Sequence, residues 1–382
     1  EKHMKAARKP ASDIREISLR SRKAQYTYLA KLAEGCTSQT AILYRDNECI
    51  LPLVDLLERN GIPYQMRNAE LSFFSHRTIL DIINIIKLAQ KPMDTEAFLQ
   101  IYYKIGTYLR KQDAIRIARI SEEKRIPVLD VAAEDPDLNG HVLGSVRSMR
   151  THLQNLLQDS GERALYRIMQ YMGYQEYLNR SGLSDSKLEI LRILGSRADS
   201  PMELAERLEQ LKVLIREKEP DRKCPLILST IHASKGLEYD SVYLIDVADG
   251  ILPESIPQNL HQASAEELKA YEEERRLFYV GVTRAKDHLT LFTTNRPSTF
   301  CSEFLGKSSV TEEGRKNLMP VESRISRTFK QARPYAAVAG IRQTKASEEL
   351  YFRLKEELGT GVIVEHKKYG EGVVTQLDDR LV

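Results

Sequence analysis

The position of the strand-like segments along the chain constrains the fold most strongly. Short apolar runs, each suited to one buried strand, occur at 40–45, 226–231 and 241–246, and none occurs between the first and the second. Apolar residues at helical spacing lie on either side of the first run, at 21–35 and 51–60. Alternating strands and helices are typical of a parallel sheet, so we predict an α/β fold.

Residues 69–220 show a different pattern, in which helical periodicity dominates. From Ile79, isoleucines recur at i, i+3, i+4 and i+7, as expected for one face of a helix. Strand signals return after this segment. We therefore predict one sheet domain split into residues 13–68 and 221–304, with an all-helical domain of residues 69–220 inserted in it.

The C-terminal part indicates a linker followed by a small β module. Residues 305–360 are polar and show no periodicity, which predicts a flexible linker. After it, apolar residues at 362–364 and 373–375 flank a Gly370-Glu371-Gly372 turn. We predict a β-hairpin here, and we expect residues 361–382 to form only part of a small barrel.

The composition favours a soluble protein of a reducing compartment. No run approaches the roughly 20 apolar residues of a membrane-spanning helix, and the first residues contain no apolar signal segment. The four cysteines include no C-x-x-C pair and have no histidine at zinc spacing, so we expect free thiols in the cytoplasm and no membrane partner. A net charge of +3 does not by itself indicate a nucleic acid partner.

The first segment that carries chemistry is residues 228–239, where a strand leads into a polar loop. Hydroxyls and backbone N–H groups of such a loop can hold phosphate oxygens, a glycine permits close approach, and a carboxylate can accept a hydrogen bond from a ribose hydroxyl. The alternative is that the hydroxyls cap a following helix and the histidine is structural. The loop residues concerned are Thr230, His232, Ser234, Lys235, Gly236 and Glu238.

The second segment is residues 272–286, an acidic and basic stretch with an apolar stripe. The spacing of Leu277, Gly281 and Arg284 places them on one side of a helix. A guanidinium at the end of a buried stripe needs an anion, and Arg284 could be an arginine finger for a γ-phosphate. A salt bridge to Glu273 or Glu274, or exposure to solvent, is the alternative.

In this order, the two segments resemble motifs V and VI of the UvrD/Rep/PcrA-like superfamily 1 DNA helicases. The first contains T-x-H-x-S-K-G-L-E and the second E-E-E-R-R-L-x-Y-V-G-V-T-R-A. Residues 41–47 resemble the family's I-L-Y-R-x-N segment, and residues 364–372 resemble its V-x-H-x-K-F-G-x-G tail. The resemblance covers most of the chain from about Asp13, although the helical part matches in layout more than in residues.

The resemblance implies a RecA-like domain of the P-loop NTPase type that lacks the P-loop, the family's 2A domain. It further implies a helical 2B insertion and a partial C-terminal Tudor-like module. Arg284 would contact the γ-phosphate of ATP, and Glu238 would bind the ribose, with Gly236 and Lys235 beside the nucleotide. The residues that would contact DNA or couple it to the nucleotide are Tyr44, Arg45, Asn47, Thr230, His232 and Ser234.

The implied activity is ATP-dependent movement in the 3′ to 5′ direction on single-stranded DNA, with Mg²⁺. No G-x-x-x-x-G-K-[ST] phosphate loop and no acidic Walker B pair occurs in this chain. We therefore expect the phosphate loop and the Mg²⁺ ligands to lie on N-terminal helicase domains missing here, and this fragment alone to be inactive. The other implied partners are DNA junctions and, through the C-terminal module, RNA polymerase.

One segment departs from the family pattern. The family's duplex-gripping loop reads R-G-I-G, whereas this chain has Tyr103-Lys104-Ile105-Gly106, with lysine in place of the first glycine. We expect that Lys104 could meet a DNA phosphate. The alternative function is a helicase-like scaffold without catalysis that holds DNA or a protein. A helicase–nuclease fusion ranks below both, because no carboxylate cluster of a nuclease follows Phe304.

Overall fold

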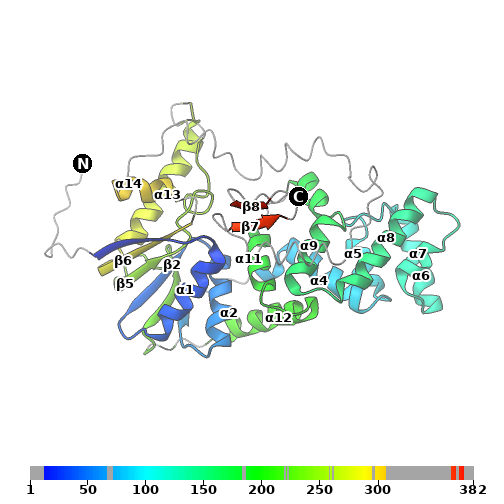
Figure 1. The fold of residues 1–382 in the computed structure, drawn as a ribbon, viewed down its shortest axis with the longest axis horizontal. Helices are drawn as coiled ribbons and strands as arrows, with labels where there is room; N and C mark the ends of the chain where they lie inside the picture. The colour runs from blue at the N-terminus through cyan, green and yellow to red at the C-terminus, as the bar shows by residue number, and fades with distance from the viewer. Residues whose placement is uncertain are drawn as a thin grey trace. The chain divides into compact units, whose positions relative to one another are not determined.

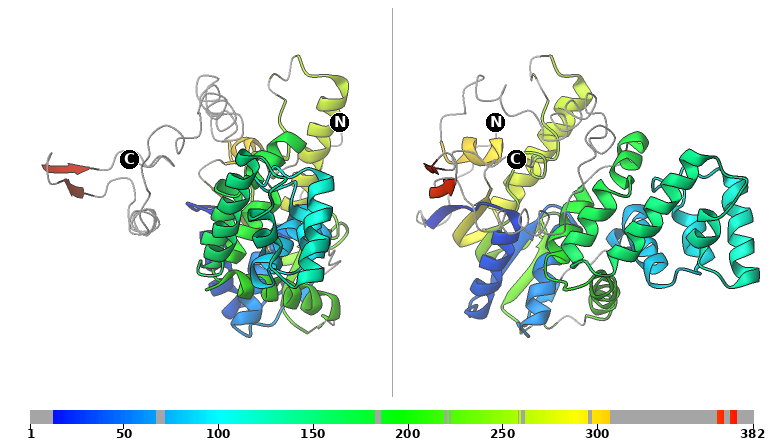
Figure 2. Two further views of the ribbon diagram at one scale, coloured as in Figure 1. Left: turned by 90° about the vertical axis from the view of Figure 1, so that its right-hand side faces the viewer. Right: turned by 45° about the vertical axis from the view of Figure 1, so that its right-hand side comes forward.

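The computed structural model describes residues 13–66, 72–182, 186–218, 221, 223–257, 259, 262–294, 297–306, 363–366 and 370–373. The chain divides into two compact units, Glu1–Ser309 and Val310–Val382. Figures 1 and 2 show the first unit, with a sheet at one end and a group of helices at the other. None of the helices in these described ranges combines the length and the apolar character that crossing a bilayer requires.

A six-stranded parallel sheet lies in the first unit, with the order β1-β6-β5-β2-β4-β3. This sheet and its covering helices confirm the predicted α/β class. One strand, β3, was missed, because two residues leave no apolar run to detect. The strands are β1 (Asp13–Ser18), β2 (Thr40–Tyr44), β3 (Gln65–Met66), β4 (Leu226–Thr230), β5 (Tyr239–Leu244) and β6 (Ala285–Thr293).

Helices cover both faces of the sheet (Figure 1). Alternation along β2 sends Ile42 and Tyr44 into the core beneath α1 (Arg22–Glu34) and α2 (Leu51–Arg59). The residues between them, Ala41 and Leu43, join the opposite core beneath α13 (Ala265–Val282). Because both faces are buried, the strand reads as a continuous apolar run.

The ends of α1 and α13 follow from capping residues. The Ser21 hydroxyl accepts a hydrogen bond from the Ala24 N–H at 3.2 Å, and α1 stops at Gly35. A capping box between Ser264 and Glu267 starts α13. At its other end the prediction was wrong: the helix stops at Val282, two residues before Arg284, which the spacing had placed on the helix.

Between β3 and β4 the described residues form helices and no strand. These helices share one hydrophobic core with α2 and the nearer face of the sheet. The predicted change to helical structure is therefore confirmed, and among the described residues the helical core is continuous with that of the sheet. The helices are α3 (Ser72–Ser75), α4 (Arg77–Gln90), α5 (Thr95–Ile101), α6 (Lys111–Lys124), α7 (Val128–Ala133), α8 (Gly140–Leu156), α9 (Gly161–Gln170), α10 (Tyr174–Ser181), α11 (Ser186–Gly195) and α12 (Pro201–Glu217).

In the second unit, the described residues form an antiparallel hairpin of β7 (Ile363–His366) and β8 (Gly370–Val373). The hairpin confirms the predicted strand pair, but Gly370 to Gly372 lie in a strand rather than in the turn. The remainder of the predicted Tudor-like module, and residues 307–360 of the predicted linker, lie outside the described residues.

Candidate functional site

The predicted site residues gather along the loop of residues 231–238, which connects β4 to β5. At its start, Thr230 pairs with Tyr44, where both strands end. At its finish, Tyr239 pairs with Ala285, where both strands begin. Because the strands are parallel, the loop passes from the carboxyl edge of the sheet to its amino edge, roughly 13 Å for four residue steps along a strand. The loop therefore connects two separate positions on the sheet, the carboxyl edge beside Tyr44 and the amino edge beside Ala285.

Within the loop, a compact turn replaces the helix that the capping alternative required. The Thr230 hydroxyl accepts a hydrogen bond from the Ala233 N–H at 3.1 Å, and the Ser234 hydroxyl donates to the Ile231 carbonyl at 2.7 Å. Gly236 has a φ of +81°, a conformation that favours glycine. These contacts hold His232, Lys235 and Glu238 on the exposed side of the loop.

Ser234 is fully buried and is occupied by its bond to the backbone. We therefore correct the expectation that it touches DNA: its hydroxyl stabilises the turn. Thr230 is half-buried, and its oxygen accepts the Ala233 N–H. Both residues shape the loop, so the capping chemistry of the alternative is present without the helix.

Arg284 lies at the amino edge of the sheet, in the turn between α13 and β6. It follows the last helical residue by two positions, so it does not belong to the helical stripe that the spacing suggested. Its guanidinium donates to the carbonyl oxygens of Val280 and Leu237 at 3.0 and 2.8 Å, and to the Thr283 hydroxyl at 3.1 Å. The contact with Leu237 places Arg284 directly beside the loop.

All three of these partners are neutral, so the positive charge of Arg284 is not compensated by a carboxylate in the described part of the chain. The two carboxylates of the alternative are engaged elsewhere. Glu273 pairs with Arg276 at 2.6 Å, and Glu274 pairs with Arg45 at 2.7 Å. A guanidinium has five N–H donors, so Arg284 keeps donors and charge for an anion.

At the carboxyl edge, Arg45 follows the last residue of β2 and points toward α13. Its guanidinium is hydrogen-bonded to both oxygens of Glu274, with the shortest contact 2.7 Å, and it also pairs with Asp46 at 3.1 Å. The side chains of Arg45 and Glu274 are 18% and 13% exposed. Sequence reasoning had considered Glu274 only as a partner of Arg284, because nothing in the sequence connects it to β2.

Tyr44 and Asn47 complete the segment predicted to line a DNA strand. Tyr44 is fully buried in the core beneath α1 and α2, so we correct its predicted role: its ring packs inside and does not face a strand. Burial also raises the pKa of its hydroxyl well above the usual range. Asn47 begins a short 3₁₀ helix, η1 (Asn47–Ile50), and is half-buried.

His232 lies within electrostatic reach of the Arg45 pair. Partial burial and the charges of Arg45 and Lys235 lower the pKa of its imidazole below the usual 6.5, while Glu274 opposes the shift. His232 therefore favours the neutral form at pH 7. Together, Arg45, His232 and Glu274 form the carboxyl-edge group, and Leu237, Glu238 and Arg284 form the amino-edge group.

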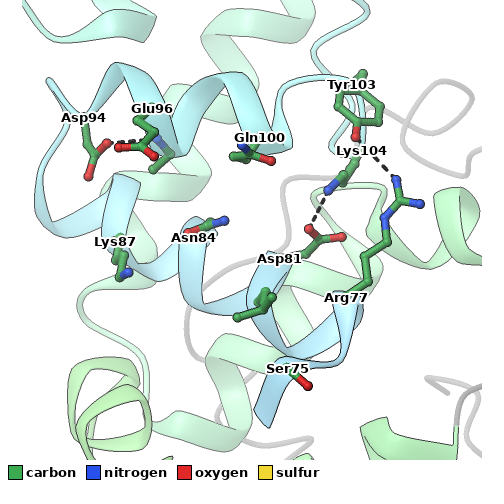
Figure 3. Close-up of a pocket in the computed structure, with 12 residues that line it drawn as sticks. Ser75, Arg77, Asp81, Asn84, Lys87, Asp94, Glu96, Gln100, Tyr103 and Lys104 are labelled. Atoms are coloured by element: carbon green, nitrogen blue, oxygen red, sulfur yellow. Dashed lines mark hydrogen bonds and ion pairs between the residues drawn. The ribbon is translucent and has the colours of Figure 1, made fainter. Parts of the chain in front are cut away.

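Lys104 lies elsewhere, in the helical segment, and does not have the predicted role. It is 4% exposed and is paired with the buried Asp81, which also accepts a hydrogen bond from the Tyr174 hydroxyl at 2.9 Å. Its ammonium is buried against Asp81 and is not presented to solvent, so we correct the expectation that it meets a phosphate. Figure 3 shows the pair on the wall of a polar hollow of about 650 Å³ between α4 and α5.

Comparison with known proteins gives one matching family model, the UvrD-like helicase C-terminal domain, over residues 9–296. The chain is 29% identical over 288 residues to the ATP-dependent DNA helicase Rep of Escherichia coli, covering 69% of this chain and 40% of that protein. It is 25% identical over 366 residues to DNA helicase II of Haemophilus influenzae, covering 90% and 48%. It is 25% identical over 372 residues to the helicase PcrA of Staphylococcus epidermidis, again covering 90% and 48%. The chain therefore spans less than half the length of each of these relatives.

Proposed function

The chain belongs to the UvrD-like helicase C-terminal domain family, and from this membership we propose that it is the C-terminal motor half of an ATP-dependent 3′ to 5′ DNA helicase. Relatives named as ATP-dependent DNA helicases support the class of enzyme. The observation that carries the proposal is the position of Arg284, whose charged guanidinium lies against the loop of residues 231–238 with neutral oxygens as its only partners among the described residues.

The amino-edge group has the chemistry of one wall of a nucleotide site. Arg284 keeps its charge for a phosphate group, and an exposed carboxylate at Glu238 can accept a hydrogen bond from a ribose hydroxyl. Lys235 is exposed on the same loop and offers a second cation. ATP would supply the hydrolysable phosphoanhydride, and the phosphate loop and Mg²⁺ ligands would belong to N-terminal helicase domains, because this sequence contains no such loop.

The carboxyl-edge group is our candidate for the contact with single-stranded DNA, including its junctions with duplex. His232 is exposed and the charge of Arg45 acts on it, so both can reach a phosphodiester if Arg45 exchanges partners. The loop of residues 231–238 connects this group to Arg284 through a few residues. A change at the nucleotide can thereby move the DNA contact, which is what a translocase requires. Binding of RNA polymerase by the C-terminal module stays a prediction.

Replacement of Arg284 tests the proposal in a protein that carries this chain together with its N-terminal helicase domains. We expect Arg284→Ala to retain ATP binding, since the phosphate loop lies elsewhere, and to lower kcat for ATP hydrolysis by about 10³-fold or more, as for other arginine fingers. Steady-state hydrolysis with saturating single-stranded DNA and binding of a fluorescent ATP analogue measure the two quantities.

Arg276→Ala is the matched control, because Arg276 lies in α13, is exposed and pairs only with a neighbour on the same helix among the described residues. It should hydrolyse ATP at the wild-type rate. Wild-type turnover in Arg284→Ala would refute the arginine-finger assignment. Hydrolysis of ATP by the 382-residue chain alone would refute the proposal that a further domain supplies the phosphate loop, and would leave the role of Arg284 to the first experiment.

A further inference from the structure

Arg45 faces more negative charge than its own positive charge can balance. Its guanidinium lies 2.7 Å from Glu274, 3.1 Å from Asp46 and 3.8 Å from Glu254. In addition, Glu274 is engaged through both of its oxygens. Three carboxylates around one guanidinium repel an approaching phosphodiester, so this arrangement does not present Arg45 to DNA.

The three carboxylates differ in how firmly they are held. Asp46 and Glu254 are 45% and 71% exposed, and solvent screens them. Glu274 is 13% exposed and makes the closest contact with Arg45, so it contributes most to holding that side chain. It is also the only one of the three on α13, the helix that leads to Arg284.

We propose that Glu274 is a positioning residue that competes with the DNA backbone for Arg45, and so keeps the carboxyl-edge group in a state of weak DNA affinity until α13 moves. The inference rests on the proposed function, since it assumes that this group meets single-stranded DNA. Glu274 lies eight positions before the end of α13 at Val282, roughly 12 Å along the helix, and Arg284 follows two residues after that end. One rigid element therefore carries the competitor and leads to the arginine finger.

A purely structural pair predicts the opposite behaviour. If Glu274 only orients Arg45 for DNA, its loss should weaken binding, because the guanidinium would become disordered. If Glu274 competes with DNA, its loss should strengthen binding and add a phosphate contact. The slope of log affinity against log salt concentration counts such contacts at about 0.7 per phosphate for single strands, so the two roles are separable.

The experiment measures binding of a labelled oligothymidylate to the 382-residue chain by fluorescence anisotropy at several salt concentrations. For Glu274→Gln we expect affinity to rise by about three- to tenfold and the salt slope to steepen by about 0.7. The glutamine keeps an oxygen acceptor for Arg45, so the fold is retained. Glu273→Gln is the matched control, because it removes the same charge one residue earlier, from an exposed pair with Arg276.

A double variant tests whether Glu274 acts through Arg45. In an Arg45→Ala background, Glu274→Gln should leave both the affinity and the slope unchanged. The inference would be overturned if Glu274→Gln and Glu273→Gln had equal affinity and salt slope, or if Glu274→Gln bound DNA more weakly than the wild type. In either case, binding of the oligonucleotide by the wild type would leave the proposed DNA contact standing. If neither the wild type nor Glu274→Gln binds the oligonucleotide, both the proposed DNA contact and the inference fail.

Discussion

At the scale of single residues, neighbours in the sequence take opposite roles where a strand ends. Tyr44 is fully buried, whereas Arg45 extends toward α13 and is partly exposed. The same contrast separates His232, which is exposed, from Ser234, whose hydroxyl is enclosed in the turn. The chemistry of the carboxyl edge therefore depends on the side chains of Arg45 and His232, and on the carboxylate of Glu274 that pairs with Arg45.

We expect the imidazole of His232 to titrate below 6.5, because burial and the positive charges of Arg45 and Lys235 disfavour its protonation. Between the lowered pKa of the folded state and 6.5, the unfolded chain binds more protons than the folded one. Stability at this group is therefore highest above pH 6.5 and is lost as the pH falls from 6.5 through the folded-state pKa. A histidine ring titration by NMR, with the signal assigned from His232→Gln, measures the pKa.

In Arg45→Ala the titration midpoint of the His232 imidazole should rise only part of the way toward 6.5, because burial is the larger cause of the lowered pKa and remains in the variant. His76, whose imidazole pKa is lowered by burial and by the charge of Lys187, serves as an internal reference whose midpoint should be the same in both proteins. An unchanged midpoint for His232 in Arg45→Ala would show that the Arg45 charge does not act on it, and a wild-type midpoint at or above 6.5 would contradict both causes.

The family resemblance implied that Arg284 lies beside the loop of residues 231–238, because it placed both at one nucleotide. Sequence reasoning could not tell that Tyr44 points inward, since a strand buried on both faces has no alternation to read. Nor could it pair Arg45 with Glu274, which are 229 positions apart in the chain. Contacts of that kind depend on how α13 is placed on the sheet.

At the scale of elements, the sheet and its helices were predictable where their signals were local. Runs of apolar residues indicated β2, β4 and β5 within a few residues of their ends, and helical spacing indicated α1 and α2. The end of α13 was not predictable, because the helical spacing continues to Arg284 while the Thr283 hydroxyl bonds to the carbonyls of Tyr279 and Val280 in the last turn.

Gly281 sets how closely α13 approaches the sheet. A Cβ at this position would lie 3.2 Å from Leu244 Cδ1 and 3.6 Å from Ile231 Cγ2, which leaves no room for a branched side chain. We expect Gly281→Val to lower the free energy of unfolding by about 1–3 kcal/mol through overpacking. Because it would also displace Arg284, ATP turnover in the complete protein should fall. Urea unfolding of the 382-residue chain measures the first effect.

Gly144→Val is the matched control, because Gly144 is the fifth residue of α8 and no atom outside that helix lies within 4 Å of its added Cβ. Valine has a better helix propensity than glycine, so this variant should be neutral or slightly more stable. Equal stability of Gly281→Val and wild type would mean that α13 tolerates a larger separation from β5 than its packing suggests.

At the scale of the whole first unit, ion pairs as well as the shared core connect the helical segment to the sheet domain. Asp55 on α2 is 1% exposed and accepts hydrogen bonds from Arg59 at 3.0 Å and from Arg207, on α12, at 2.7 Å. Arg197 approaches the same carboxylate at 3.6 Å. One buried carboxylate thus compensates three guanidiniums from three parts of the chain.

We expect Asp55→Asn to destabilise this connection more than any surface charge change, since it removes the buried carboxylate that three guanidiniums share and leaves only Arg59 with a second one among the described residues, Glu203 at 3.7 Å. The free energy of unfolding should fall by about 2–4 kcal/mol, in the range for breaking one side of a buried pair. Asp287→Asn is the control, because it removes the same charge from an exposed position. Urea unfolding followed by circular dichroism compares the two variants. If Asp55 holds α12 on α2, high salt should recover part of the lost stability of Asp55→Asn by screening the repulsion between the three guanidiniums. Equal urea midpoints for Asp55→Asn and Asp287→Asn would exclude that role.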